Sequence, residues 1–407
     1  MSDNVFILGA GFSYDAGIPL LGGFIQKMRD FASGRKHKLL SKEDKSLFLE
    51  AISIIEELEP YHGRSNFDDR NIEDVLSILT FNYMGGGSRS RNNINIFNKA
   101  ITRVIELSSL VQDFDFKSDR GCLRYSEKGR VQLYLDFWDA ILSYFLESGE
   151  FPVFITFNYD LVLERSLAQL LTIPEWSVND ISIPKINLSY SYKPFSEKYL
   201  SVVNQNYFIP SVDPNLVHRG IKLVAEDSLE DQEDAAKLEI LKLHGSVNFP
   251  RPGIKYKHNH HLSKPNENPL ILPPIFNKTQ NNAISKVWAR ALNVLRSARN
   301  CIFVGYSLPR TDVYMSYFLK AALGPNSNLE NIHIFDPCIY QNEGGENELI
   351  GRYKDCFSPQ TQRKMHYRHE PFSNEGFIYN DDFSKLDLGT TKHMIQLLKA
   401  DSSYLLY

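Results

Sequence analysis

Short runs of apolar residues recur along this chain, and each run ends in glycine or polar residues. The runs cover residues 5–8, 152–155, 236–243, 300–304 and 332–335. A continuous apolar run of this length is typical of a strand buried on both faces, as in a parallel sheet. Helix-like patterns follow several of the runs. We therefore predict an α/β fold, a doubly wound (Rossmann-like) parallel sheet.

Two long stretches interrupt this pattern. Between residues 33 and 149, apolar residues recur at spacings of three and four, which predicts helices over 45–58, 72–79, 94–110 and 131–146. The glycine- and serine-rich run 85–93 is expected to be a solvated loop. Residues 172–235 have scattered prolines and no clear period. We interpret them as an irregular insertion, and residues 33–149 as a helical insertion. The remaining predicted units are a core made of 1–32, 150–171 and 236–345, and a C-terminal segment, 346–407.

The composition is that of an ordinary globular protein. Of its 407 residues, 43% are hydrophobic and 23% are charged, and the net charge is -4. Such a charge gives no general attraction to nucleic acid or to anionic membranes. There is no long apolar segment and no basic start of a signal peptide, so we expect a cytoplasmic protein. The four cysteines form no C-x-x-C pair. Cys301 and Cys338 adjoin apolar runs, and we expect both to be buried thiols.

The first apolar run leads into the most distinctive stretch of the chain. Gly9 and Gly11 follow it directly, at a point where the backbone turns and where phosphates can approach without meeting a side chain. Tyr14 occupies the place of the third glycine of the dehydrogenase fingerprint G-x-G-x-x-G. The stretch therefore predicts a nucleotide-binding turn of another kind, or a tight turn without a ligand.

Polar residues also follow the later runs. Because parallel strands bring their carboxyl ends to one edge of the sheet, these residues are expected to gather at a ligand site. Each also has a structural interpretation: Asn158 as a turn residue, Asp160 as a helix N-cap, His244 as a satisfied histidine and Asp336 as a strand-end turn. The strand-end residues in question are Thr156, Asn158, Asp160, His244, Gly305, Ser307 and Asp336.

Two further groups of residues are expected to be structural. Glu73 and Asp74 fall at the start of a predicted helix, where the helix dipole favours carboxylates, although a place near a substrate is the alternative. His258, His260 and His261 lie in a polar, proline-rich stretch, and we expect no metal site there.

Taken together, these motifs resemble those of the sirtuins, in the order in which that family has them. The opening pattern Gly-Ala-Gly-x-Ser-x-x-x-Gly-Ile-Pro is matched at 9–19, Thr-x-Asn-x-Asp at 156–160, Leu-His-Gly at 243–245 and Gly-x-Ser-Leu at 305–308. The resemblance implies that Asn158 and His244 are catalytic. It also implies an NAD site formed by Gly9, Ala10, Gly11, Ser13, Asp15, Thr156, Asp160, Gly305, Ser307 and Asp336.

The chain departs from the sirtuin deacylases at several points. Leu20, Leu21 and Gly22 stand where those enzymes have an acidic-aromatic-arginine continuation, and Phe157 replaces a glutamine. The cysteines cannot form the four-cysteine zinc module that helps deacylases hold an acyl-lysine peptide. The chain is more similar to the sirtuin-like effectors of bacterial antiphage defence.

That resemblance implies an NAD hydrolase, an abortive-infection effector that releases nicotinamide and ADP-ribose, with NAD as substrate and no metal. The alternatives are an NAD-dependent protein deacylase or ADP-ribosyltransferase, and a non-catalytic sensor of NAD or ADP-ribose. Since no stretch of the chain is typical of a sensor, we expect activation by homo-oligomer formation or by a co-encoded partner. Such partners are a helicase-like ATPase of the HerA type or an argonaute-type sensor.

Overall fold

The computed structural model describes residues 3–34, 40–58, 67–85, 88–108, 130–170, 185–192, 221–224, 235–251, 269–272, 284–310, 312–340 and 347–367. Within them lies an eight-stranded sheet in the order β4-β3-β5-β2-β1-β6-β7-β8, and each neighbouring pair runs parallel. The strands are β1 (Asn4–Leu8), β2 (Val153–Thr156), β3 (Lys185–Ser189), β4 (Ile221–Val224), β5 (Ala235–Lys242), β6 (Asn300–Val304), β7 (Asn331–Phe335) and β8 (Met365–Tyr367).

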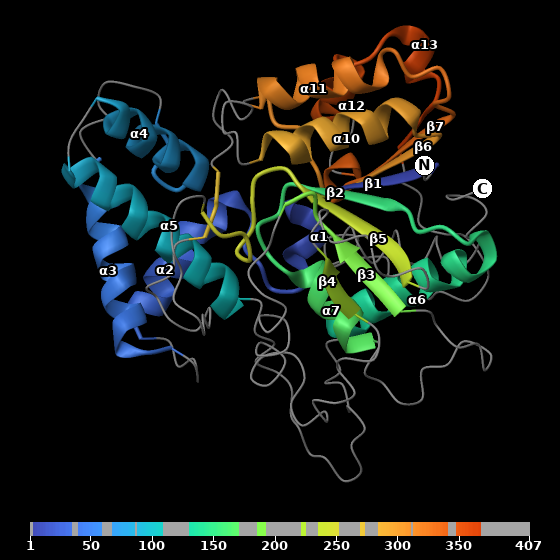
Figure 1. Cartoon of the computed structure of the whole chain (residues 1–407). Coiled ribbons are helices and arrows are strands. Elements are labelled where there is room, and N and C mark those ends of the chain that lie inside the picture. The colour runs from blue at the N-terminus through green and yellow to red at the C-terminus, as the bar shows by residue number, and fades with distance from the viewer. Residues whose placement is uncertain are drawn as a thin grey trace, which may run out of the picture.

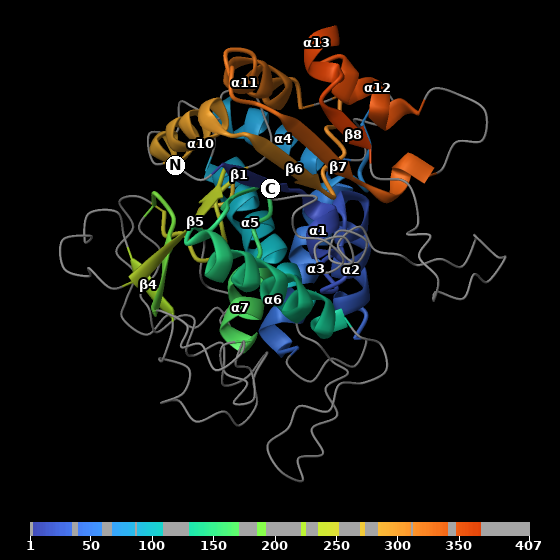
Figure 2. The same ribbon diagram turned by 90° about the vertical axis from the view of Figure 1, so that its right-hand side faces the viewer.

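Helices cover both faces of this sheet (Figure 1, Figure 2). One face packs against α10 (Ser285–Ser297), α11 (Val313–Leu323) and α12 (Glu348–Lys354). The opposite face packs against α1 (Ala10–Tyr14), α6 (Arg130–Ser148) and α7 (Val162–Leu170). The prediction of a doubly wound α/β fold is confirmed.

The sequence of β1 explains its central place. Successive side chains of a strand point to opposite faces, so Val5 and Ile7 enter one core cluster while Phe6 and Leu8 enter the other. All five residues of β1 are buried. The strand pairs with β2 on one side and with β6 on the other, so the chain reverses its direction of winding next to β1. In open α/β sheets, such a switch point is where ligands bind.

The helices between β1 and β2 begin and end close to the predicted ranges. After a short 3-10 turn, η1 (Leu21–Gly23), they are α2 (Phe24–Ala32), α3 (Lys42–Glu56), α4 (Ile72–Met84), α5 (Ser88–Ser108) and α6. The expected loop over 85–93 is wrong in part, because α5 already begins at Ser88.

Inside this helical group, a buried ion pair joins Arg103 Nε to Asp44 Oδ1 at 2.6 Å. Burial alone would raise the pKa of Asp44, but Arg103 lowers it.

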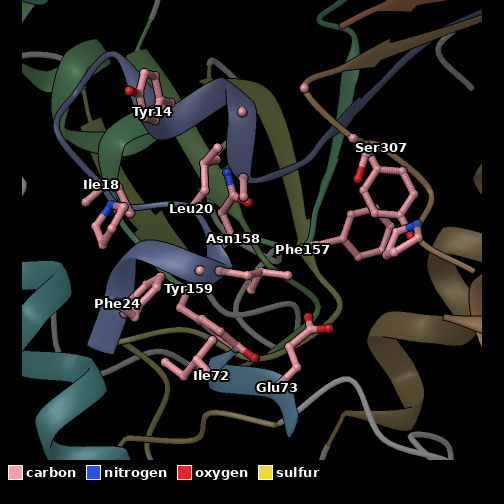
Figure 3. A pocket seen from close by; sticks show the side chains of 18 of the residues that line it. Tyr14, Ile18, Leu20, Phe24, Ile72, Glu73, Phe157, Asn158, Tyr159 and Ser307 are labelled. Atoms are coloured by element: carbon pink, nitrogen blue, oxygen red, sulfur yellow. The ribbon is translucent and has the colours of Figure 1, made fainter. Parts of the chain in front are cut away.

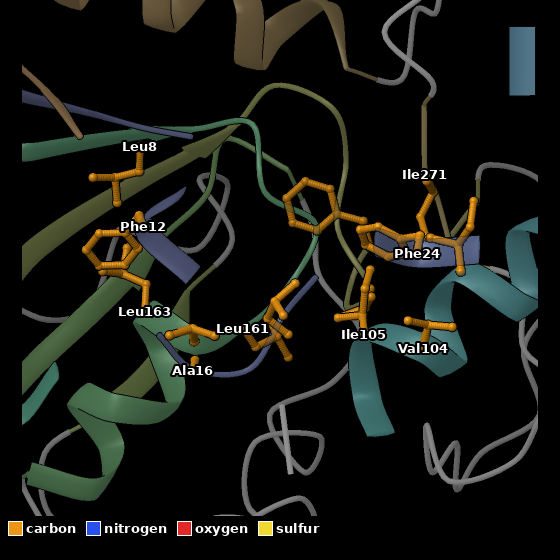
Figure 4. Close-up of a cluster of buried hydrophobic side chains, with 14 of the residues drawn as sticks. Leu8, Phe12, Ala16, Phe24, Val104, Ile105, Leu161, Leu163 and Ile271 are labelled. Carbon is orange, nitrogen blue, oxygen red and sulfur yellow. The ribbon is translucent and has the colours of Figure 1, made fainter. Parts of the chain in front are cut away.

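The helical group and the sheet share one hydrophobic core. Figure 4 shows side chains of this core running from Leu8 and Phe12 beside the sheet to Val104 and Ile105 on α5. α6 belongs to the layer that covers the sheet, since Phe137 makes an edge contact with Phe154 of β2 at 6.0 Å.

Two other predicted units also contribute to the sheet. β3 and β4 come from residues 172–235, and most of that stretch lies outside the described residues. The C-terminal segment supplies α12, the short α13 (Pro359–Gln362) and the edge strand β8. Another short 3-10 helix, η6 (Pro337–Tyr340), follows β7. The three histidines at 258, 260 and 261 are not among the described residues.

The turn after β1 packs directly against the loop after β6. Gly11 N donates a hydrogen bond to Gly305 O at 2.9 Å. A Cβ atom added to Gly305 would lie 2.5 Å from Gly11 C and from Phe12 N, and φ at Gly305 is +60°. No side chain fits at that distance from backbone atoms, and a residue other than glycine is disfavoured at that φ. The two loops can therefore meet only through glycine.

We predict that Gly305→Ala destabilises the protein by about 3 kcal/mol or more, because the backbones of two loops must separate. Gly351→Ala is the matched control. Gly351 lies inside α12 with no atom within 4 Å of an added Cβ, so alanine should leave stability unchanged or raise it by up to about 1 kcal/mol. Thermal unfolding of both variants checks this. Equal melting temperatures of the two variants would contradict the close contact between the loops that follow β1 and β6.

Candidate functional site

A cavity of about 510 Å³ opens at the carboxyl ends of the central strands (Figure 3). A volume of several hundred cubic ångströms is typical of small-molecule sites. The sheet edge forms one wall, and η1, α4 and α5 form the other. Most of the predicted site residues line it: Ala10, Gly11, Asn158, Asp160, His244, Gly305, Ser307 and Asp336.

The side chain of Asn158 is held by the turn that follows β1. Its Nδ2 donates to Gly9 O at 2.8 Å and to Ser13 Oγ at 2.9 Å. A carbonyl oxygen only accepts, so the contact with Gly9 fixes which end of the amide is nitrogen. Both N–H groups are then used within the protein. The amide oxygen, Oδ1, receives no hydrogen bond from the described residues and remains as an acceptor for the cavity.

The other predicted residues are absent from the lining of the cavity. Ser13 is buried and accepts from Asn158, so it positions a site residue. Thr156 Oγ1 donates to Leu8 O at 3.2 Å and accepts from Asn158 N at 3.1 Å. Gly9 presents its carbonyl group to Asn158. Asp15 ends α1 and is absent from the lining.

Gly11 lines the cavity and also forms a close contact within the protein. The sequence suggests that its missing side chain leaves room for phosphates. An added Cβ would instead lie 2.7 Å from Gly305 Cα, within the loop contact. The N–H of Gly11 is bonded to Gly305 O, and that of Gly305 to Phe335 O. These glycines therefore bring two loops together, and their N–H groups are already used within the protein.

His244 follows β5, and the backbone at His244 and Ser246 is hydrogen-bonded to the segment 270–272. Its carbonyl accepts from Leu272 N at 2.8 Å, and Ser246 N donates to Leu270 O at 3.0 Å. The ring is buried and lies 5.2 Å from the ring of Phe157 and 6.2 Å from that of Tyr159. The imidazole therefore has a fixed place in the cavity wall.

Asp160 combines the two roles that the sequence left open. It lines the cavity, and its Oδ1 accepts from Val162 N at 3.0 Å at the start of α7. Beneath it, the buried Lys242 donates from Nζ to Asp160 O and pairs with Glu164 Oε1 at 2.9 Å. Tyr190 donates its hydroxyl to the same carboxylate at 3.2 Å. A buried charge pair thus supports the floor of the site.

The loop after β6 has a strained backbone and several anchors. Leu308 is buried and has φ of +45°, a conformation that costs of order 1 kcal/mol or more for a residue with a side chain. Tyr353 OH donates to Tyr306 O at 2.6 Å, and Tyr306 OH donates to Asp312 Oδ2 at 3.3 Å. Asp312 also caps α11 through Met315 N. These bonds hold Ser307 at the cavity.

Asp336 follows β7 and is buried at the cavity wall. Burial raises the pKa of its carboxyl group, while a hydrogen bond from Cys338 N at 2.9 Å and the charge of Arg352 oppose that rise.

The expectation that Cys338 is buried is wrong. Its side chain is exposed and lines the cavity, although partial burial and the charge of Asp336 raise the pKa of its thiol to about 11. Cys301 is buried, as expected.

The sequence analysis missed most of the wall opposite the sheet edge. This wall is apolar. Ile18 belongs to the motif at 9–19, and the other members lie on segments whose main signal was helical periodicity. Its members are Ile18, Leu20, Leu21, Phe24, Ile72, Leu76, Ile101 and Ile105. Of the acidic pair at the start of α4, Glu73 lines the cavity and Asp74 does not.

The charges around the cavity all have one sign. Glu73, Asp160, Asp312 and Asp336 line it, and the described lining includes no lysine or arginine. Burial raises the pKa of Tyr159 and Tyr306, and the charges of Glu73 and Asp312 add to that rise. Both phenols are therefore neutral at ordinary pH. Such a site favours ligands with hydroxyl groups or positive charge.

Comparison with protein-family models and with curated proteins finds no match for this chain. Within the described residues, no helix is both long and apolar enough to span a bilayer. The same residues contain no group of three or more histidine, cysteine, aspartate or glutamate side chains that are placed to hold a metal ion.

We predict that Lys242→Met destabilises the protein by about 3–5 kcal/mol, because Glu164 is left as an unpaired buried charge. The double variant Lys242→Met, Glu164→Gln should recover much of that loss. Thermal unfolding of the single and double variants at neutral pH measures both. If the single variant were as stable as the wild type, the ion pair between Lys242 and Glu164 would not stabilise the floor of the site.

Proposed function

We propose that this chain is an NAD hydrolase that releases nicotinamide and ADP-ribose. The main observation in its support is the pairing of Asn158 with His244. They follow different strands, yet both line one cavity, and the amide of Asn158 keeps its oxygen available there. These are the two residues that the resemblance to sirtuins implies as catalytic. The motifs implied to bind the dinucleotide meet at the same sheet edge.

In the proposed reaction, the bond between C1′ of the ribose and the nicotinamide nitrogen breaks, and its electron pair leaves with nicotinamide. Asn158 Oδ1 accepts a hydrogen bond from the attacking water and orients it toward C1′. The water oxygen bonds to C1′, and His244 takes the released proton, directly or through a ribose hydroxyl. The products are nicotinamide, ADP-ribose and one proton.

Three of the remaining predicted residues, Asp160, Asp336 and Ser307, bind the dinucleotide in this proposal. Asp160 holds the carboxamide of nicotinamide, and Asp336 accepts hydrogen bonds from the adenosine ribose. Since the N–H groups of Gly11 and Gly305 are already bonded, the hydroxyl of Ser307 is a candidate donor for the pyrophosphate. The buried, acidic wall suits the positively charged nicotinamide end of the substrate.

The direct test is incubation of the purified chain with NAD, with and without an acylated peptide, followed by chromatography. ADP-ribose formed in both samples supports hydrolysis. O-acyl-ADP-ribose would indicate a deacylase, and ADP-ribose attached to protein would indicate a transferase. Bound but unchanged NAD would indicate either a sensor of NAD or ADP-ribose or an enzyme held inactive until it assembles.

We predict that Asn158→Ala and His244→Ala each lower the rate of NAD cleavage by about 10²-fold or more, the usual effect of losing a positioned acid–base or electrostatic group. Asn293→Ala is the control, because Asn293 is exposed on α10 and absent from the cavity lining. Its rate should equal that of the wild type. Folded Asn158→Ala or His244→Ala protein with full turnover would contradict the mechanism.

We also propose that activity depends on assembly, either with further copies of this chain or with a partner such as a HerA-type ATPase or an argonaute-type sensor. Its support is the exposed apolar end of α4, where Phe81, Tyr83 and Met84 are 59%, 41% and 74% exposed. An apolar surface of this kind is typical of a site that another protein covers.

The prediction is that NAD turnover per chain rises with protein concentration or with addition of the partner. Light scattering measured beside turnover checks it. A monomer whose rate per chain is high and constant would contradict the proposal. On the resemblance to the defence effectors, we propose that the cellular role of this activity is antiphage defence.

A further inference from the structure

A tyrosine, Tyr159, follows Asn158 directly and lines the same cavity. Its hydroxyl donates a hydrogen bond to Leu272 O at 2.7 Å. Figure 3 shows the ring at the cavity, with its hydroxyl end directed away from Asn158. Because the single hydroxyl proton is used within the protein, the phenol is not a proton donor for a ligand. Its contacts instead lead to His244.

The residue that accepts this hydrogen bond also holds His244. Leu272 N donates to His244 O at 2.8 Å, so the two backbone groups of Leu272 bond to Tyr159 and to His244. Gly245 pairs with the same segment, 270–272, in an antiparallel bridge. This segment therefore connects the hydroxyl of Tyr159 to the residue that carries the candidate base.

The backbone of Tyr159 makes a second connection to the loop after β5. Its carbonyl oxygen accepts from Val247 N at 2.9 Å and from Ser246 Oγ at 3.1 Å. The ring of Tyr159 also lies 6.2 Å from the ring of His244. Contacts from both ends of the tyrosine therefore join the residue beside Asn158 to the loop that carries His244.

The proposed reaction depends on the distance between the two groups that are joined in this way. The amide oxygen of Asn158 and the imidazole of His244 must both reach the attacking water, directly or through a ribose hydroxyl. A misplacement of about 1 Å near a reacting group can lower a rate by about 10²-fold. Gly9 O and Ser13 Oγ already hold Asn158. Tyr159 is thus placed to fix the base relative to an amide that is held elsewhere.

We propose that Tyr159 is a positioning residue for NAD cleavage: its hydroxyl, through Leu272, holds His244 where the imidazole takes the proton of the attacking water. This inference rests on the proposed function. Tyr159 gives up no proton and forms no bond to the substrate. The electron pair of the broken bond still leaves with nicotinamide, and the water proton goes to His244. A residue between Asn158 and Asp160 then orients a base that lies on another loop.

The test compares Tyr159→Phe with Tyr192→Phe. Each variant removes one hydroxyl that donates to a backbone carbonyl, in the control to Pro250 O at 2.6 Å, but Tyr192 is absent from the cavity lining. We expect Tyr159→Phe to lower kcat for NAD by about tenfold and to change KM by less than about twofold, because the ring stays and only the base is displaced. Tyr192→Phe should stay within about twofold of the wild type in both constants. Equal losses of kcat in the two variants, or full kcat in Tyr159→Phe, would overturn the proposal.

A second comparison shows whether Tyr159 acts through His244. In a His244→Ala background, Tyr159→Phe should cause no further loss of kcat, because the group that the tyrosine positions is gone. If Tyr159→Phe lowers kcat equally in the wild-type and His244→Ala backgrounds, the proposed connection to the base is wrong.

Hydrogen exchange of the backbone amides tests the connection without any substrate. The N–H group of Leu272 is bonded to His244 O, so it should exchange about tenfold faster in Tyr159→Phe than in the wild type. In Tyr192→Phe it should exchange at the wild-type rate. Unchanged exchange of Leu272 in Tyr159→Phe would overturn the hold of the hydroxyl on this segment.

This proposal and the proposed function fail in different ways. A wild-type chain that leaves NAD intact at every protein concentration would overturn the hydrolase together with the catalytic effect of Tyr159. Faster exchange in Tyr159→Phe would then show only a structural contact. A wild-type chain that cleaves NAD, beside a fully active Tyr159→Phe variant, would overturn the role of Tyr159 alone.

Discussion

The turn after β1 and the loop after β6 touch backbone to backbone, and the geometry of the candidate site depends on that contact. Gly9, Gly11 and Gly305 meet at distances where a Cβ atom has no room. Because no side chain separates the two loops, the loops stay as close together as the paired strands β1 and β6 that lead into them. The Gly9 carbonyl is then placed to orient Asn158, and Ser307 is held on the other side of the cavity.

Backbone groups fix the two residues of the proposed mechanism. Asn158 is oriented by a carbonyl group and a buried serine, and the segment around Leu272 clamps His244 from one side. Backbone positions in a packed sheet vary little, so the amide and the imidazole have little freedom to turn away. Lys242 adds to this by supporting the carbonyl of Asp160 from below. Preorganisation of this kind lets polar groups stabilise a transition state without reorganising during the reaction.

The cavity joins two parts of the fold with different chemistry. The sheet edge supplies hydrogen-bonding groups, while η1, α4 and α5 supply apolar side chains that limit access of water. Among the described residues of the helical wall, Glu73 is the only charged residue that lines the cavity. The two parts share one hydrophobic core, so a shift of the helices relative to the sheet would change the cavity directly. This coupling gives the proposed assembly at the helices a physical route to the site.

The sequence by itself determined the five central strands of the sheet, the doubly wound fold and the edge at which polar residues gather. Buried parallel strands are continuous apolar runs, and their carboxyl ends must share one edge, so Asn158, His244 and Asp336 could be brought together without coordinates. Only the tertiary structure decided which way each side chain turns. Ser13 and Thr156 turn inward to hold Asn158, and a Cβ atom at Gly11 would meet Gly305. Glu73 faces the cavity while Asp74 does not, because long-range packing of α4 sets the rotation of that helix, and a local pattern contains no information on it.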